Sequence, residues 1–149
     1  MNKLRVISRA IILDKDNILL ARNKDADFWY PPGGGWEEET ESLEESVQRE
    51  VKEETGYLID VSSLLWVREF REPEKNKISL ETFWKTTISP DNEQTTEGLS
   101  SHTDLDSDGA VEECRWFPLD TISDVKILPR FLKNHLNPSD LSGDAFINE

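Results

Sequence analysis

The apolar residues of this chain are grouped in short blocks, and most of the blocks are typical of β-strands. Five blocks rich in β-branched, aliphatic and aromatic residues predict strands: 4–13, 18–22, 58–70, 78–88 and 110–117. Turn-forming residues at 14–17 and at 72–77 separate neighbouring blocks and predict two hairpins. The pattern is therefore that of a chain built mainly of strands.

One segment differs, because residues 41–54 are good helix formers without Pro or Gly, and Gly56 follows where a helix commonly ends. A second, short helix is predicted at 128–136. Residues 89–109 are polar and acidic and predict a long loop, and residues 137–149 predict a loosely held tail. Strands surrounding one good helix favour an α/β or α+β sandwich with a mixed β-sheet.

Length and charge narrow the classes of function. A chain of 149 residues suits one domain, which we place at residues 1–149. The 31 Asp and Glu residues outnumber the 17 Lys and Arg residues, for a net charge of −14. That charge repels nucleic acid and anionic lipid, so neither is expected as a partner, and it repels a phosphorylated substrate unless a divalent cation lies between them.

The single cysteine, Cys114, excludes an intrachain disulfide. The lack of a signal-peptide core or membrane-spanning stretch predicts a cytoplasmic location.

The predicted helix carries acidic residues where apolar ones are expected. On a helical wheel Val47 and Val51 define the stripe that faces the core, and Glu50 and Glu54 fall within about 60° of Val47. Glu53 flanks them. A buried carboxylate must be protonated, paired or metal-bound, and the negative end of the helix dipole adds to the cost of each charge. A cluster of this kind indicates a site for a hard divalent cation, which prefers oxygen ligands.

A solvated acidic face is the alternative explanation of the same residues. Nine of the 18 residues from Glu37 to Glu54 are glutamate, so a cluster can arise by composition alone. The helical wheel by itself does not decide between the two interpretations.

Seven residues in and around this helix settle the choice by their spacing: Gly35, Glu41, Arg49, Glu50, Glu53, Glu54 and Gly56. They match every invariant position of G-x5-E-x7-R-E-U-x-E-E-x-G-U, where U is a bulky aliphatic residue, and so resemble the Nudix box over residues 35–57. The last position carries the aromatic Tyr57 in place of an aliphatic residue. Weaker similarity extends to the Pro-Gly-Gly segment 29–34 and to the Glu-x-x-Trp segment 113–119.

The resemblance implies a Nudix fold, in which a mixed sheet lies between helices and the box forms a loop–helix–loop. It also implies hydrolysis of a nucleoside diphosphate linked to another group, with Mg²⁺ or Mn²⁺ as cofactor. The metal ligands implied are the side chains of Glu50 and Glu54, the carbonyl group of Gly35 and the side chain of Glu41. Glu53 is either a further ligand or the base that activates water, and Arg49 orients the catalytic carboxylates.

Residues outside the box leave alternatives open. Some members of the family place another metal ligand or base near Glu112 and Glu113; strand alternation lets only one face inward, and Glu113 is favoured. An ordinary strand carboxylate is the alternative. Pro73 lies 16 positions after Tyr57, where it resembles a marker of ADP-ribose hydrolases, but it also suits the start of a charged turn.

The sequence thus predicts a Nudix-type pyrophosphohydrolase. Its candidate substrates are ADP-ribose or another nucleotide sugar, a nucleoside triphosphate, and a dinucleoside polyphosphate. A Nudix-like domain that binds a nucleotide as a sensor, without chemistry, is the alternative, although none of the seven box residues is lost. Both a monomer and a homodimer are compatible with the sequence.

Overall fold

The computed structural model describes residues 3–92, 102–103, 111–136, 141 and 145–148. Its elements in chain order are β1 (Lys3–Asp14), β2 (Asn17–Asn23), β3 (Gly33–Gly35), α1 (Leu43–Thr55), β4 (Ile59–Glu72), the 3₁₀ turn η1 (Pro73–Lys75), β5 (Lys77–Ile88), β6 (His102–Thr103), β7 (Val111–Pro118), the 3₁₀ helices η3 (Leu119–Asp124) and η4 (Arg130–Asn134), and β8 (Ala145–Asn148). No helix in these described ranges is long and apolar enough to cross a lipid bilayer.

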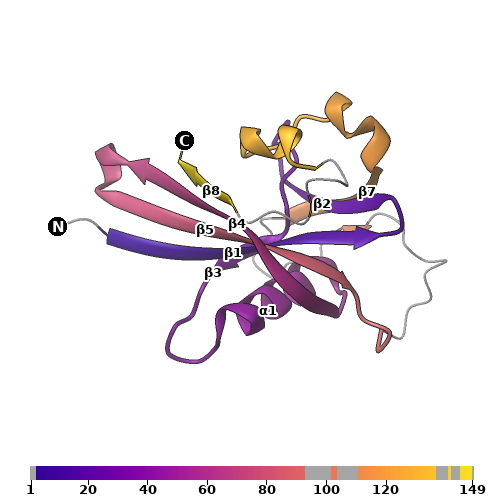
Figure 1. Ribbon diagram of the computed structural model, residues 1–149, viewed down its shortest axis with the longest axis horizontal. Helices are drawn as coiled ribbons and strands as arrows, with labels where there is room; N and C mark the ends of the chain where they lie inside the picture. Colours follow the sequence, from indigo (N-terminus) through magenta and orange to yellow (C-terminus); the bar gives the residue numbers. More distant parts are fainter. Residues whose placement is uncertain (1–2, 93–101, 104–110, 137–140, 142–144, 149) are drawn as a thin grey trace.

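The strands form one mixed sheet in the order β6-β7-β2-β1-β5-β4-β8, and the short β3 pairs with β1 beside this path. β1 runs parallel to β5 from Lys3 to Leu13, and β4 runs parallel to β8, whereas the other pairs are antiparallel. α1 covers one face of the sheet, and η3 and η4 cover the other (Figure 1). The α+β sandwich around a mixed sheet that the sequence predicts is confirmed.

Each face of the sheet has its own apolar core. On the side of α1, Ala10 and Ile12 of β1 are fully buried with Val47 and Val51 of the helix. On the other side Ile11 packs in a cluster with aromatic residues of β4, β5 and η4. Because β1 is covered on both faces, its residues form a continuous apolar run instead of an alternating one.

The chain after β7 departs from the sequence-based expectation in two places. The predicted helix at 128–136 is the short 3₁₀ helix η4, Arg130–Asn134, because Pro129 precedes it and five residues are too few for a stable α-helix. Part of the predicted loose tail at 137–149 is a strand, since Ala145–Asn148 adds to the open edge of β4. Within the predicted loop at 89–109, His102–Thr103 pairs with β7 as β6; residues 93–101 and 104–109 lie outside the described residues.

Replacement of a fully buried aromatic residue tests the core between the sheet and η4. Phe83 is 0% exposed and packs edge-on against Phe131, with 5.2 Å between ring centroids. We expect Phe83→Ala to lower the free energy of unfolding by about 3–5 kcal/mol, because it removes apolar contacts and leaves a cavity. Phe146→Ala is the matched control, since Phe146 is 61% exposed, and should change it by about 0.5 kcal/mol or less. Urea unfolding followed by circular dichroism measures both; equal losses would contradict this assignment of the core.

Candidate active site

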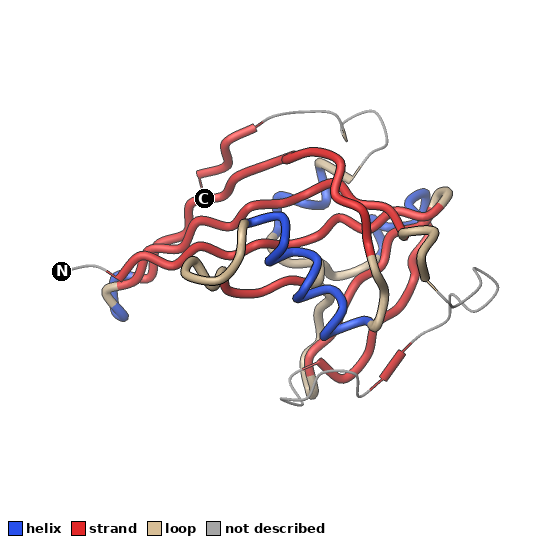
Figure 2. The backbone as a smooth tube through the Cα atoms, turned by 90° about the horizontal axis from the view of Figure 1, so that it is seen from below, coloured by secondary structure: helices blue, strands red, loops and turns tan. Residues whose placement is uncertain are grey.

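α1 has well-defined ends, each fixed by a cap. The Ser42 hydroxyl accepts a hydrogen bond from the Glu45 N–H, and the Glu45 carboxylate accepts one from the Ser42 N–H. This capping box starts the helix after Ser42, slightly later than the predicted start at 41. Gly56 ends it in the left-handed conformation, at φ 81°. Figure 2 shows α1 lying across the strands of the sheet.

The inner face of α1 carries carboxylates beside its apolar residues, as the helical wheel predicts. Val47 and Val51 are fully buried, and Glu54 is only 7% exposed. The Glu50 side chain is 15% exposed, whereas that of Glu53 is 52% exposed at the edge of the helix. The helix thus presents two shielded carboxylates and one that reaches solvent.

The glycine strand β3 lies directly against these carboxylates. The Gly33 N–H donates a hydrogen bond of 2.8 Å to Glu54 Oε2. A Cβ atom on Gly34 would lie 2.6 Å from the Glu50 carboxylate, so only glycine leaves room for that side chain as it stands. The close approach of the β3 backbone to Glu50 therefore depends on the missing side chain of Gly34, whereas that of Gly33 lets β3 pair closely with β1.

Arg49 connects the remaining residues of the cluster. Its Nε and Nη2 donate to the two carboxylate oxygens of Glu41, at 2.7 and 3.0 Å. Nη1 donates to Glu50 Oε1 at 3.1 Å and to Glu53 at 3.3 Å. Nη2 also reaches the Gly35 carbonyl oxygen, at 3.2 Å. One guanidinium group thereby holds three carboxylates and a backbone carbonyl together.

The pairing of Arg49 with Glu41 shifts the pKa values of both side chains. Hydrogen bonds from Arg49 lower the pKa of Glu41 to about 2, against the opposing effect of burial. The pKa of Arg49 is raised in turn, with the Glu41 hydrogen bond as the largest cause. Glu41 therefore stays ionised well below neutral pH.

Six of the seven predicted site residues are brought together, but Glu113 is not. Its carboxylate pairs with Arg115 at 2.6 Å and with Arg22 at 3.4 Å. The neighbouring Cys114 points to the opposite face of β7, where its Sγ donates to the Glu54 carbonyl oxygen at 3.4 Å. Glu113 thus lies on the face of the strand turned away from the helix carboxylates. Burial raises the pKa of Cys114 to about 12, so its thiol stays protonated.

The oxygen atoms of these carboxylates and of the Gly35 carbonyl are suitable ligands for a hard cation, but their present positions do not surround a common point. In the part of the chain that the structure describes, no three His, Cys, Asp or Glu side chains are positioned to hold a metal ion. The reason lies in the contacts above, since Arg49 engages Glu50 and Glu53 while Gly33 engages Glu54. All the donors are oxygen atoms, as Mg²⁺ and Mn²⁺ prefer, and Gly34 leaves space beside Glu50.

A cavity of about 600 Å³ borders Gly33 and Gly34. We call it the arginine cavity, because four arginines line it: Arg5, Arg9, Arg68 and Arg130. Sequence reasoning missed these residues, because they come from β1, β4 and the start of η4. The only signal was the even spacing of Arg5 and Arg9, which places both on one face of a strand.

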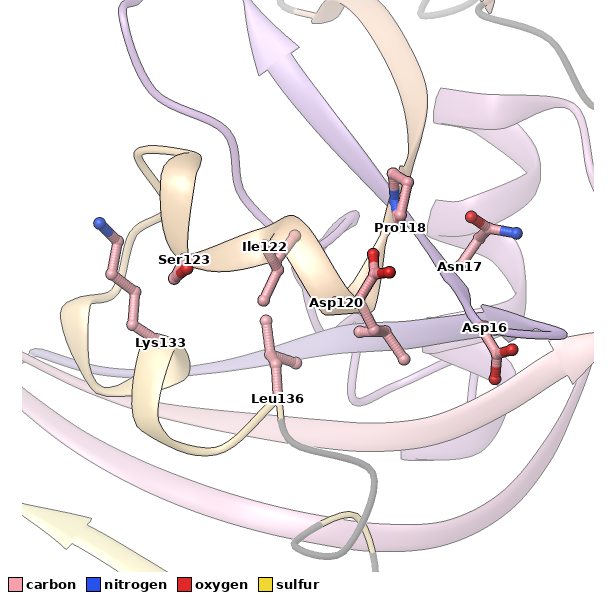
Figure 3. Close-up of a pocket in the computed structure, with 9 residues that line it drawn as sticks. Asp16, Asn17, Pro118, Asp120, Ile122, Ser123, Lys133 and Leu136 are labelled. Carbon is pink, nitrogen blue, oxygen red and sulfur yellow. The ribbon is translucent and has the colours of Figure 1, made fainter.

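A further cavity, of about 480 Å³, lies between the β1–β2 turn and the two 3₁₀ helices (Figure 3). Ile122 and Leu136 point toward each other across it, with Asp16 at one end and Lys133 at the other. None of its lining residues belongs to α1 or β3, so it takes no part in the carboxylate cluster.

The low pKa of Glu41 predicts a pH-dependent contribution to stability. Its folded-state pKa of about 2 lies below the ordinary 4.5, so the ion pair stabilises the fold above about pH 5 and its contribution is lost as pH falls toward 2. We expect Glu41→Gln to be less stable than the wild type at pH 7, with the difference shrinking between pH 5 and pH 2. Urea unfolding at several pH values in metal-free buffer measures this, with the exposed Glu38→Gln as control. A difference that is constant with pH would contradict the assignment.

Comparison with known proteins identifies the family of this chain. The family model of the NUDIX domain matches residues 3–135. The chain is 43% identical over 74 residues to the ADP-ribose pyrophosphatase of Methanocaldococcus jannaschii, a match that covers 46% of this chain and 44% of that protein. The aligned part thus spans less than half the length of this curated relative.

Solved structures show the same fold. A UDP-X diphosphatase superposes with a TM-score of 0.71 at 19% identity, covering 98% of this chain and 68% of that chain. A MutT Nudix hydrolase from Burkholderia pseudomallei gives a TM-score of 0.60 at 25% identity, covering 80% of this chain and 86% of that chain. Because the family model spans nearly all of the sequence and the architecture agrees, the chain belongs to the Nudix hydrolase family.

Proposed function

We propose that this protein is a pyrophosphohydrolase that uses a divalent cation to cleave the diphosphate bridge between a nucleoside and another group. The observation that carries the proposal is the contact between the glycine strand and the helix carboxylates: Glu54 accepts a hydrogen bond from the Gly33 N–H, and Glu50 lies against Gly34. Arg49 donates a hydrogen bond to Glu50 in the same cluster. Shielded carboxylates next to bare backbone let a cation and a phosphate group approach together.

The residues suited to hold Mg²⁺ or Mn²⁺ are Glu50, Glu54, Glu53 and the Gly35 carbonyl. When bound, such an ion neutralises charge on phosphate oxygens and lowers the pKa of a water molecule. Glu41 is the least suited, because both of its carboxylate oxygens already accept hydrogen bonds from Arg49. Its role in the proposal is to hold Arg49, and Glu113 is left out because it faces away.

Arg49 orients the carboxylates in this proposal. Its bonds to Glu50 and Glu53 are longer than those to Glu41, so side-chain rotation can exchange them while Glu41 keeps the guanidinium in place. Glu53 is the exposed member of the cluster and the one that reaches water. It serves as a metal ligand or as the base that takes a proton from the attacking water.

The candidates for the group beyond the diphosphate come from the comparisons and the sequence. A nucleotide sugar such as ADP-ribose is supported by the similarity to the Methanocaldococcus jannaschii enzyme, and a nucleoside triphosphate or dinucleoside polyphosphate remains a candidate. Pro73 does not strengthen the case for ADP-ribose, because it is exposed and begins the 3₁₀ turn between β4 and β5. Its position is explained by the turn alone.

A substrate panel assayed with Mg²⁺, Mn²⁺ or EDTA tests the function. We expect metal-dependent release of a nucleoside monophosphate, and a loss of kcat by about 100-fold or more in Glu53→Gln and in Glu54→Gln. Glu44→Gln is the control, because Glu44 is exposed on the same helix. Turnover in EDTA, or wild-type rates in both variants, would overturn the proposal. Binding without turnover for every compound would instead support the sensor alternative.

Gly34→Ala tests the contact between β3 and α1. Its Cβ would meet the end of a flexible side chain, so we expect Glu50 to move away at little cost in stability while activity falls and the Mg²⁺ needed for half-maximal rate rises. Gly33→Ala is the contrasting variant, since its Cβ would lie 2.0 Å from the Ser8 carbonyl oxygen and should destabilise the β1–β3 pair. Thermal melts and Mg²⁺ titrations measure the two effects. Full activity of Gly34→Ala would show that Glu50 does not need this space.

A further inference from the structure

Two buried serine hydroxyls join β1 to α1. The Oγ atoms of Ser8 and Ser46 lie 2.9 Å apart and share a hydrogen bond, and both residues are 0% exposed. Val47, the next residue of α1, is fully buried in the apolar core on this side of the sheet. Burying hydroxyl groups costs free energy that an apolar pair would not cost. The serine pair therefore indicates a role beyond packing.

The protons of the two hydroxyls need two acceptors, and the pair itself supplies only one. Arg49 is the largest cause of the low pKa of Glu41, and a hydrogen bond from the Ser46 side chain is a further one. An ionised carboxylate accepts hydrogen bonds and donates none, so Ser46 gives its proton to Glu41. Ser8 must then be the donor in the serine pair. The order of donation is from β1 through the helix to the carboxylate.

Glu41 is held by more groups than Arg49 alone. Its two carboxylate oxygens accept from Arg49 at 2.7 and 3.0 Å, and Oε2 also accepts from the Glu37 N–H at 3.2 Å. The Glu41 side chain is only 8% exposed, so water contributes little to its position. The carboxylate is thus bound both to Arg49 and to a chain of hydroxyls that ends on β1.

The position of Glu41 matters for the site because Arg49 also engages carboxylates that suit a cation. Its bonds to Glu50 and Glu53, at 3.1 and 3.3 Å, must be released before those groups turn to a positive ion. A fixed Glu41 keeps the guanidinium in place during that exchange. A Glu41 without its serine donor is free to move with Arg49 toward the other carboxylates, where the guanidinium competes with the cation.

We propose that Ser46 is a positioning residue for hydrolysis, itself held in place by Ser8. It fixes Glu41, and thereby keeps the Arg49 guanidinium in place, while the other carboxylates of the cluster turn to the cation. The inference rests on the proposed function only in taking those carboxylates as cation ligands.

A double-mutant cycle of Ser46→Ala and Glu41→Ala tests the contact without metal or substrate. Alanine favours the helix more than serine does, so the single variant is not informative, but the cycle cancels that effect. We expect the effect of Ser46→Ala on the folding equilibrium constant to differ about 5-fold or more between the wild-type and Glu41→Ala backgrounds. Urea unfolding at pH 7 in EDTA measures it.

Thr86→Val is the matched control for this cycle. The Thr86 hydroxyl is equally buried and donates to a carbonyl of β1, that of Ile11, at 3.1 Å. Its removal should be additive with Glu41→Ala, because it bonds to the same strand but not to the carboxylate cluster.

Calorimetry with Mn²⁺ follows the consequence for the site. Ser46→Ala and Ser8→Ala should each weaken Mn²⁺ binding about 3-fold or more, whereas Thr86→Val should bind like the wild type. With substrate present, Ser46→Ala should raise the Mg²⁺ concentration needed for half-maximal rate by a similar factor. It should change the KM for the substrate less, because the serine acts through Glu41 and Arg49.

Each outcome decides the positioning role or the proposed function. Additive effects of Ser46→Ala and Glu41→Ala, or wild-type Mn²⁺ affinity in either serine variant, overturn the positioning role; metal-dependent turnover then leaves the proposed function standing. Non-additive effects with weaker Mn²⁺ binding, but no turnover of any substrate, support the positioning role and count against the enzyme. If the wild type binds no Mn²⁺, the proposed function fails, and the cycle alone decides whether Ser46 holds Glu41.

Discussion

The contact between the bare backbone of β3 and the carboxylates of α1 is the constraint on which the site depends. Glu54 is shielded from water and retains a donor because the Gly33 N–H points at it, and Glu50 fits because Gly34 has no side chain. The same two glycines border the arginine cavity. A larger residue at Gly34 would collide with the Glu50 carboxylate, and one at Gly33 would collide with the Ser8 carbonyl oxygen of β1.

Charge is organised around this glycine strand in two opposite ways. On the helix side several carboxylates gather near the negative end of the helix dipole, and one guanidinium, that of Arg49, offsets their repulsion. On the far side one buried carboxylate, Glu81, holds two arginines in a cavity where positive charge dominates. An anionic chain can therefore present a local positive surface beside an oxygen-lined site.

The parts of this structure that depend on local pattern were predictable from the sequence. The strand blocks, the helix that Ser42 and Gly56 delimit, and the inward position of Glu50 and Glu54 all follow from spacing along the chain. The arginine cavity was not predictable, because it depends on which strands become neighbours and on where η4 lies. The orientation of Glu113 was not predictable for the same reason. Strand alternation lets either Glu112 or Glu113 face the helix, and the pairing of β7 with β2 decides which one does. β8 formed where a tail was expected because β4 offers an open edge, a property of the sheet and not of residues 145–148.

The pleat of β1 links the two sides of the protein through single residues. Ser8 bonds Ser46 of the helix, Arg9 lines the cavity, Ala10 packs under α1 and Ile11 enters the opposite core. Insertion or deletion of one residue here would exchange these faces, turning Arg9 toward the helix and an apolar side chain toward the cavity. The length of this segment of β1 is therefore constrained, and relatives that differ in overall size should accommodate the difference in their connecting loops.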